Sequence, residues 1–327
     1  MRVLALTFGD EQQASSKYRV FQFIEPLAKL GIQLEPTPAN AFAKWSEVRQ
    51  YDAILVQKKL FRSSKVRFLR RNTARLIYDI DDAIWHPHGK EHSFFTNLRN
   101  RWRLKAIARA ADLCICANDV LAAHMRGMTD HTTVIPLGLE GSRWHRKTDS
   151  ESSAVVRAGW SGHPVNLPYL EAIEPALLQA QTDNPQIEFA IFCGKAPAFR
   201  SLKYRHIRFQ PDTEVEVLRG FDVGLLPLPP GPFAAGKSPI KGIQYMATGI
   251  PTVLTPMGAT REMFSEGQTG LFASSNEEWH RAINQLVRDP AARQRMGSRA
   301  RATFESTYEL TRIVPLLAKA LVPASRA

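Results

Sequence analysis

Residues 75–89, RLIYDIDDAIWHPHG, place five side chains capable of chemistry at the end of an apolar run: Asp79, Asp81, Asp82, His86 and His88. Asp79 and Asp81 have the spacing of a carboxylate pair that holds a divalent metal, and the histidines could complete a zinc-like site. A proline between the histidines and their loop position disfavour a metal there. We expect Asp81 and Asp82 to bind hydroxyl groups or to accept a proton. Asp79 is equally compatible with a structural role in the turn.

A second stretch, AAGKSPIKGIQYMATGIPTVLT (residues 234–255), combines lysines with the start of a helix. The Ser-Pro pair at 238–239 predicts that start, because serine is a favoured N-cap and proline a favoured first helical residue. Lys237 and Lys241 flank it. Free N–H groups, the helix dipole and two ammonium groups together suit a diphosphate. Gln244, one turn after Lys241, could hydrogen-bond a sugar or ribose hydroxyl.

The net charge of +12 is held unevenly, because residues 1–150 contain 24 Lys and Arg against 15 Asp and Glu, a balance of +9. Eight of these cations fall between residues 58 and 75 with no acid among them, and five more follow in the predicted helix 96–110. Such a field suits nucleic acid, an anionic membrane surface or a phosphorylated substrate. No nucleic-acid-binding module is evident, so we expect no nucleic-acid partner.

Apolar residues interleave with the cations of 58–75: Leu60, Phe61, Phe68 and Leu69. This pattern suggests that the basic helix docks on an anionic membrane to reach a lipid-linked acceptor. No apolar run is long enough for a membrane span and the start does not read as a signal peptide. We expect a cytoplasmic protein, with peripheral association at the inner membrane face as an option that this helix raises. The three cysteines are too few for a disulfide framework and are interpreted as reduced core thiols.

Runs rich in Val, Ile and Leu alternate with amphipathic stretches along the chain. This alternation predicts parallel strands joined by crossover helices, which could position the residues named above. Periodicity is lost over 138–153, where Gly, Ser and charge gather, and the alternation then restarts. We therefore predict an α/β protein with two Rossmann-like, doubly wound domains facing each other across a cleft. Sites should lie at the carboxyl ends of the strands.

Several segments of the chain carry a further signal: SSKYRVFQFIEPLAKLGI, YDIDDAIW, RAADLCICANDVLAAHM, TTVIPLGLE, AGWSGHPVNLPYLE, and the run from FDVGLLPLPPG through FESTYEL. Together they resemble family-four glycosyltransferases, retaining sugar-nucleotide enzymes of the GT-B fold. The resemblance covers nearly the whole chain. It implies an N-terminal acceptor-side domain over 1–145, a nucleotide-sugar-binding domain over 154–308 and a final helix, 309–327, that packs back toward the first domain.

The resemblance also implies roles for individual residues. Lys237 and Lys241 match positions that neutralise a donor diphosphate, with no metal and no further cofactor required. Gln244 matches the second acid of the family's paired-glutamate motif, which contacts ribose, and the first acid falls on Gly236. These two departures leave open a non-catalytic GT-B binding or regulatory protein as the alternative to an enzyme.

Softer assignments complete the predicted site. The donor-binding candidates are Gly9, Ser161, Gly162, Gly258 and Glu262. Ser16 and Arg19, with Ser15, are expected at the start of the first helix, where Arg19 either binds a phosphate or acceptor carboxylate or pairs with a nearby acid. The resemblance implies transfer of a sugar, with retention, to a saccharide or lipid-linked acceptor in cell-surface polysaccharide or glycolipid synthesis.

Overall fold

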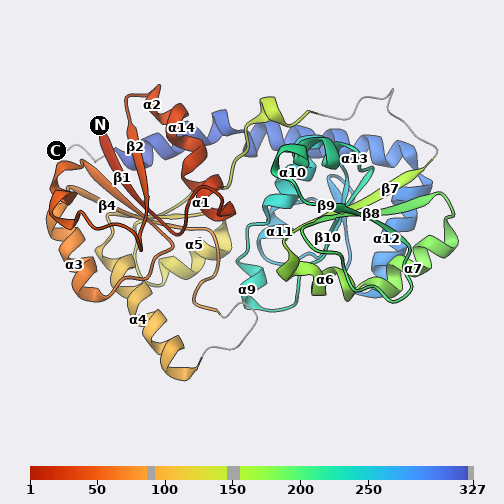
Figure 1. Cartoon of the computed structure of the whole chain (residues 1–327), viewed down its shortest axis with the longest axis horizontal. Helices are drawn as coiled ribbons and strands as arrows, with labels where there is room; N and C mark the ends of the chain where they lie inside the picture. Colours follow the sequence, from red (N-terminus) through yellow and green to blue (C-terminus); the bar gives the residue numbers. More distant parts are fainter. Residues whose placement is uncertain (87–92, 146–154, 323–327) are drawn as a thin grey trace. The chain divides into compact units, whose positions relative to one another are not determined.

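The computed structural model describes residues 1–86, 93–145 and 155–322. The chain divides into two compact units (Figure 1). The first comprises Met1–Gly138, Gly231–Ser238 and Leu310–Ala327, and the second comprises Leu139–Pro230 and Pro239–Glu309. The first unit therefore takes a short segment, 231–238, out of the middle of the second half of the sequence.

Six parallel strands form the sheet of the first unit, in the order β2-β1-β3-β4-β5-β6. They are β1 (Arg2–Thr7), β2 (Gln33–Pro38), β3 (Ala53–Gln57), β4 (Arg75–Ile80), β5 (Leu113–Cys116) and β6 (Thr132–Val134). The order reverses at β1, which pairs with both β2 and β3. Ligand sites of doubly wound sheets lie beyond the carboxyl ends of the strands at such a reversal.

Helices cover both faces of this sheet, because successive residues of a strand point to opposite sides. Leu4 and Leu6 pack on one side against α3 (Ser63–Asn72), α4 (Phe94–Ala110) and α5 (Asp119–Arg126). Val3 and Ala5 pack on the other side against α2 (Ile24–Ala28) and α14 (Leu310–Leu321). The last helix thus belongs to the core of the first unit.

The second unit repeats the architecture with a parallel sheet in the order β12-β11-β10-β7-β8-β9. Its strands are β7 (Val156–Ser161), β8 (Ile187–Cys193), β9 (Tyr204–Arg208), β10 (Val223–Leu226), β11 (Thr252–Leu254) and β12 (Gly270–Phe272). Its larger helices are α7 (Glu174–Asp183), α10 (Ile240–Thr248), α12 (Asn276–Arg288) and α13 (Pro290–Thr303). The sheet order reverses at β7.

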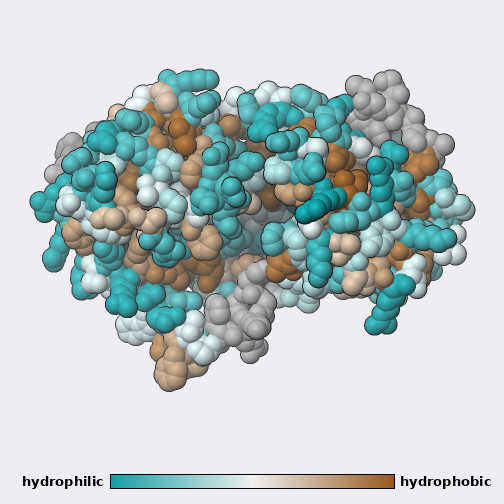
Figure 2. All heavy atoms as spheres, viewed as in Figure 1, coloured by the Kyte–Doolittle hydropathy of each residue, from teal (hydrophilic) through white to brown (hydrophobic). Residues whose placement is uncertain are grey.

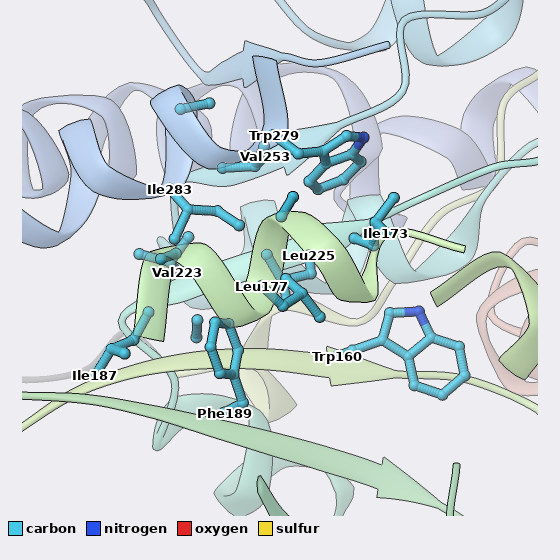
Figure 3. Packing of buried hydrophobic residues seen from close by; sticks show 14 of the residues in the cluster. Trp160, Ile173, Leu177, Ile187, Phe189, Val223, Leu225, Val253, Trp279 and Ile283 are labelled. Atoms are coloured by element: carbon cyan, nitrogen blue, oxygen red, sulfur yellow. The ribbon is translucent and has the colours of Figure 1, made fainter. Parts of the chain in front are cut away.

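Trp160, Leu177, Phe189 and Trp279 lie in the core on one face of this second sheet (Figure 3). The short elements α6 (Leu167–Glu171), α8 (Glu214–Arg219), α9 (Pro232–Ala235) and α11 (Ala259–Met263) complete the chain with α1 (Ala14–Arg19). The predicted two-domain Rossmann-like α/β fold is confirmed, although the short elements β12, α9 and α11 were not predicted. No helix within the described residues combines the length and apolar character that a membrane crossing needs.

Candidate functional site

A buried polar cluster occupies the carboxyl ends of β1, β3 and β4 in the first unit, next to the reversal of strand order. Ser16 of α1 accepts a hydrogen bond from the N–H of Gly9 over 3.0 Å. Its hydroxyl also donates to Gln57 Oε1 over 3.2 Å, and the same oxygen accepts from the N–H of Phe8 over 3.0 Å. Gly9 and Ser16, both predicted from the sequence, are thus bonded directly, and Gln57, which was not predicted, bonds Ser16 and Phe8. These bonds tie the loop after β1 to the end of β3.

Lys58, which follows β3 directly, lies at the centre of this cluster. Its Nζ is 3.1 Å from Asp81 Oδ1 and also forms an ion pair with Asp82. Ser15 donates its hydroxyl hydrogen to Asp81 Oδ2 over 2.5 Å. Burial disfavours the charge of Lys58, but the two carboxylates outweigh it and hold the pKa of Lys58 above its ordinary value. Asp81 and Asp82 are therefore carboxylates held by a buried cation.

The backbone of Lys58 adopts a left-handed conformation with φ of 60°. That conformation costs an L-residue with a side chain roughly 1–2 kcal/mol, and such strain clusters at functional sites. Lys58 was not predicted as a site residue. It is the first residue of the basic segment 58–75 and was therefore assigned to the predicted membrane-docking helix. The available signal was its place directly after a buried strand, at the same sheet edge as Asp81.

Of the two roles predicted for Arg19, the structure shows the one in which Arg19 pairs with a nearby acid. Its Nε donates to Asp79 Oδ2 over 3.0 Å, its second guanidinium nitrogen bonds the other carboxylate oxygen, and a third donates to the carbonyl of Ile135 over 2.7 Å. Both side chains are buried. Burial raises the pKa of Asp79, and the guanidinium only partly offsets this. Arg19 and Asp79 therefore have a structural role that fixes α1 on the sheet.

Lys237 lies within the first unit, near this cluster. Burial lowers its pKa, the attraction of Asp82 opposes that shift, and the positive charge of Lys58 adds to it. The ion pairs formed among the described residues do not include Lys237. Lys237 is thus a partly buried cation near a second, buried cation, which is an arrangement that favours an anionic ligand.

The start of α10 differs from the sequence prediction. The helix begins at Ile240, and Ser238 makes no capping bond to it. Instead the side-chain amide of Asn118 donates to Ser238 Oγ over 2.7 Å and to the carbonyl of Gly236 over 3.1 Å. The prediction of Ser238 as N-cap was wrong, because Asn118 engages its hydroxyl within the first unit.

Gly236, where the family resemblance expects an acid, has no room for a side chain. An ideal Cβ there would lie 2.7 Å from the Cβ of Ala83 and 3.0 Å from Cδ2 of Leu121. Both distances are shorter than ordinary van der Waals contact. The absence of a carboxylate at this position is thus enforced by packing in the first unit.

Lys241 and Gln244 belong to the second unit. Lys241 Nζ pairs with Glu214 Oε1 of α8 over 2.7 Å. Gln244 is completely buried. In the structure as it stands, Lys241 has a protein counter-ion, and the side chain of Gln244 is not open to a ribose from solvent.

Ser161 and Gly162 lie at the end of β7, where the order of the second sheet reverses. The N–H of Ser161 donates to the hydroxyl of Tyr245 over 3.0 Å, while Ser161 Oγ is buried with no hydrogen-bond partner among the described residues. An ideal Cβ on Gly162 would lie 2.4 Å from the ring of Trp160. Gly162 is thus required by packing, and Ser161 offers an unused hydroxyl.

Gly258 and Glu262 lie in the loop and helix after β11. Gly258 has a φ of 47° and precedes α11, so glycine is required there by the backbone. Glu262 is exposed on α11. The structure assigns a local turn role to Gly258 and leaves Glu262 accessible.

No group of three or more His, Cys, Asp or Glu side chains that could hold a metal occurs among the described residues. His86 is described and burial lowers its pKa, whereas His88 lies outside the described residues. The cysteines are free and buried, and burial raises the pKa of Cys114 and Cys116 to about 12. Such thiols are poor nucleophiles at neutral pH.

The structure places most of the apolar residues of the predicted membrane-docking helix in the core. Leu69 is fully buried in α3, and Leu60 and Phe61 pack against the same core. Only Phe68 of the four apolar residues is exposed, at 37%. The apolar side of this basic segment is used by the core of the first unit.

One segment of the chain matches a known protein family, and the fold of the whole chain is similar to solved structures. Residues 174–317 match the family model of glycosyl transferase-like proteins. Among curated proteins, no sequence matches the chain at a significant level.

Several solved structures are similar along the whole length. Sucrose-phosphate synthase from Thermosynechococcus elongatus has a TM-score of 0.72 at 15% identity, over 98% of this chain and 97% of that one. Anabaena HepE in complex with UDP and glucose has a TM-score of 0.69 at 17% identity, over 98% and 99%. A glycosyltransferase from Rickettsia africae has a TM-score of 0.70 at 10% identity, over 98% and 97%. The chain therefore has the GT-B fold, and its residues 174–317 are similar to glycosyl transferase-like proteins.

Proposed function

We propose that this protein is a retaining glycosyltransferase that moves a sugar from a nucleotide-diphospho-sugar to the hydroxyl of a saccharide or lipid-linked acceptor. The observation that supports the proposal is Lys237, a partly buried ammonium that forms no ion pair among the described residues and is influenced by the charges of Asp82 and Lys58. A diphosphate would supply the missing negative charge. The GT-B fold and the family match over 174–317 support the same class of reaction.

Each group in the first-unit cluster has a role in this proposal. Lys237 stabilises the charge that develops on the diphosphate as it leaves, an effect whose removal commonly costs 100-fold to 1000-fold in rate. Asp81 and Asp82 bind acceptor or sugar hydroxyls, and one of them accepts the acceptor's proton. Lys58 fixes both carboxylates and lowers the pKa of Asp81. Under retention the hydroxyl attacks on the face that the nucleotide leaves.

Nucleotide binding is the first test. UDP, GDP, ADP, CMP and their sugars should be compared for their effect on the melting temperature, beginning with UDP-glucose because HepE was crystallised with it. A ligand present at 100 times its dissociation constant stabilises the native state by about 2.7 kcal/mol. We expect one diphosphate to raise the melting temperature, and Lys237→Met to lose that rise.

The matched control is Lys29→Met, because Lys29 is exposed at the end of α2, before the amino end of β2. It should keep the full nucleotide effect. An equal shift in Lys237→Met and wild type would refute the assignment of Lys237. Configuration at the anomeric carbon of the product, read by NMR against that of the donor, tests retention.

A nucleotide-binding protein without turnover is the second candidate. It is favoured by Gly236, where no acid fits, by the pairing of Lys241 with Glu214, and by the burial of Gln244. A nucleotide-dependent melting shift combined with no transfer and no donor hydrolysis would select this candidate. If transfer is found, we expect Lys241→Ala to abolish most of it.

A further inference from the structure

Helix α4 exposes large apolar side chains to solvent at its N-terminal half. Phe94 is 74% exposed, Phe95 80%, Leu98 42% and Trp102 69%. Positions 94, 98 and 102 are each four residues apart, and with 95 they fall in an arc of about 100° at 3.6 residues per turn. We call this set the α4 face. Figure 2 shows apolar surface at the protruding end of α4, at the bottom of the view.

The α4 face is separate from the side of the helix that packs into the core. Leu104, Ile107 and Ala108 lie on another side of the helix and are buried in the first unit. The helix start is well formed, since Ser93 Oγ accepts from the N–H of Thr96. A helix that buries one apolar side and exposes a second one needs a partner for the second.

Cations border the α4 face. Arg99, Arg101, Arg103, Lys105 and Arg109 lie along the helix, and residues 94–110 contain no acid. On the helical wheel Arg99 and Arg101 fall on the two sides of the apolar arc, and Lys105 and Arg109 continue its line toward the C-terminus. An apolar stripe with basic edges is the pattern of a helix that lies in the plane of a membrane interface.

We propose that the α4 face docks on an anionic lipid bilayer, with the phenyl and indole rings at the acyl boundary and the basic side chains among the headgroups. A second copy of the chain is the poorer occupant, because a two-fold contact would bring the cations that border this face against the same cations of its partner. The basic helix α3 is also a poorer candidate than α4, because its apolar side chains are used in the core. This inference does not depend on the proposed sugar transfer.

Vesicle flotation tests the proposal. The full chain is mixed at low salt with vesicles of phosphatidylcholine alone or with 30% phosphatidylglycerol, and the floated fraction is measured. We expect flotation with the anionic vesicles and little with the neutral ones. The double variant Phe95→Ser/Trp102→Ser should lose at least tenfold in affinity, since each ring buries a large apolar area in the bilayer. Arg99→Gln should lose roughly fivefold, or about 1 kcal/mol.

Phe68→Ser is the matched control, because Phe68 is an exposed phenylalanine on the other basic helix. It should bind as the wild type does. Trp102 is the only exposed one of the six tryptophans, all of which lie in the described residues. Brominated lipids should therefore quench its fluorescence, and Trp102→Phe should bind but lose the quenching.

Three outcomes would overturn the proposal. One is the absence of flotation with anionic vesicles, and another is a loss of binding in Phe68→Ser that equals the loss in the α4 variant. The third is a shift of the α4 variant from dimer to monomer with unchanged flotation, which would make the α4 face a contact between copies. The melting shift with nucleotide, measured on the same variant, shows whether the fold and the donor site are intact.

Discussion

Replacing Lys58 by Met should destabilise the first unit strongly. The ammonium of Lys58 is 3.1 Å from Asp81 and is paired with Asp82, and Lys58 and Asp81 are both buried. Removing one partner of a buried ion pair costs about 3–5 kcal/mol, because the other charge stays buried without compensation. Ser15 still donates to Asp81, and the side chain of Asp82 is 24% exposed. We therefore expect a loss near the lower end, about 3 kcal/mol.

Urea unfolding followed by circular dichroism gives the free energy of unfolding, and the loss should fall on one transition if the two units unfold separately. Asp81→Asn added to Lys58→Met removes the uncompensated charge, so the double variant should recover part of the loss. Interaction energies of neighbouring residues are about 0.5–3 kcal/mol. Lys58→Gly should be about 1 kcal/mol more stable than Lys58→Met, since glycine has no steric cost at a φ of 60°.

The pH dependence has a defined sign. Burial raises the pKa of Asp81, but Lys58 and Ser15 outweigh it and hold that pKa below its ordinary value. In the wild type, Asp81 thus contributes stability above about pH 4 that is lost as the pH falls through the lowered pKa. Without Lys58, burial prevails and the pKa rises above that of the unfolded chain. The deficit of Lys58→Met should therefore be larger at pH 7 than at pH 4. A deficit under 1 kcal/mol at pH 7, or no recovery in the double variant, would refute this reasoning.

Two further predictions concern Lys237 and Gly162. Burial lowers the pKa of Lys237 despite the attraction of Asp82, so its charge opposes folding below that lowered pKa. Lys237→Met should stabilise the ligand-free protein by about 1 kcal/mol at pH 7, as substitutions that relieve functional strain do. The gain should shrink as the pH rises through the pKa of Lys237, and a destabilised variant in urea unfolding would contradict the assignment. Gly162→Ala should cost about 1–3 kcal/mol, because its Cβ meets Trp160, whereas Gly194→Ala makes only ordinary contact and should melt as the wild type does.

The local pattern of apolar and polar residues was sufficient to predict the α/β fold. Runs such as AILVQ and RLIYDI are buried strands because both faces of a parallel sheet are covered, which requires continuous apolar sequence. Crossover helices between such runs allow only a parallel arrangement. The strand ends, and with them Gly9, Ser16, Asp81 and Asp82, follow directly. The strand β12 was missed because it is short and begins at Gly270, a residue type that is depleted in strands.

The local sequence pattern does not show which distant residues contact each other. Lys58 and Asp81 come together only because β3 and β4 are neighbours in register, and Asn118 reaches Ser238 only because 231–238 packs into the first unit. Neither contact leaves a mark in local sequence. The choice of partner depends on the three-dimensional course of the chain.

The two basic helices show most directly which features the sequence determines and which depend on the tertiary structure. The sequence by itself determined that residues 58–75 and 96–110 carry interleaved cations and apolar side chains. Tertiary structure alone decided which apolar side chains the core takes, namely Leu60, Phe61 and Leu69 near α3, and which it leaves to solvent, the α4 face. The physical reason is that helical periodicity states which residues share a face, whereas burial of that face depends on what the rest of the chain packs against it.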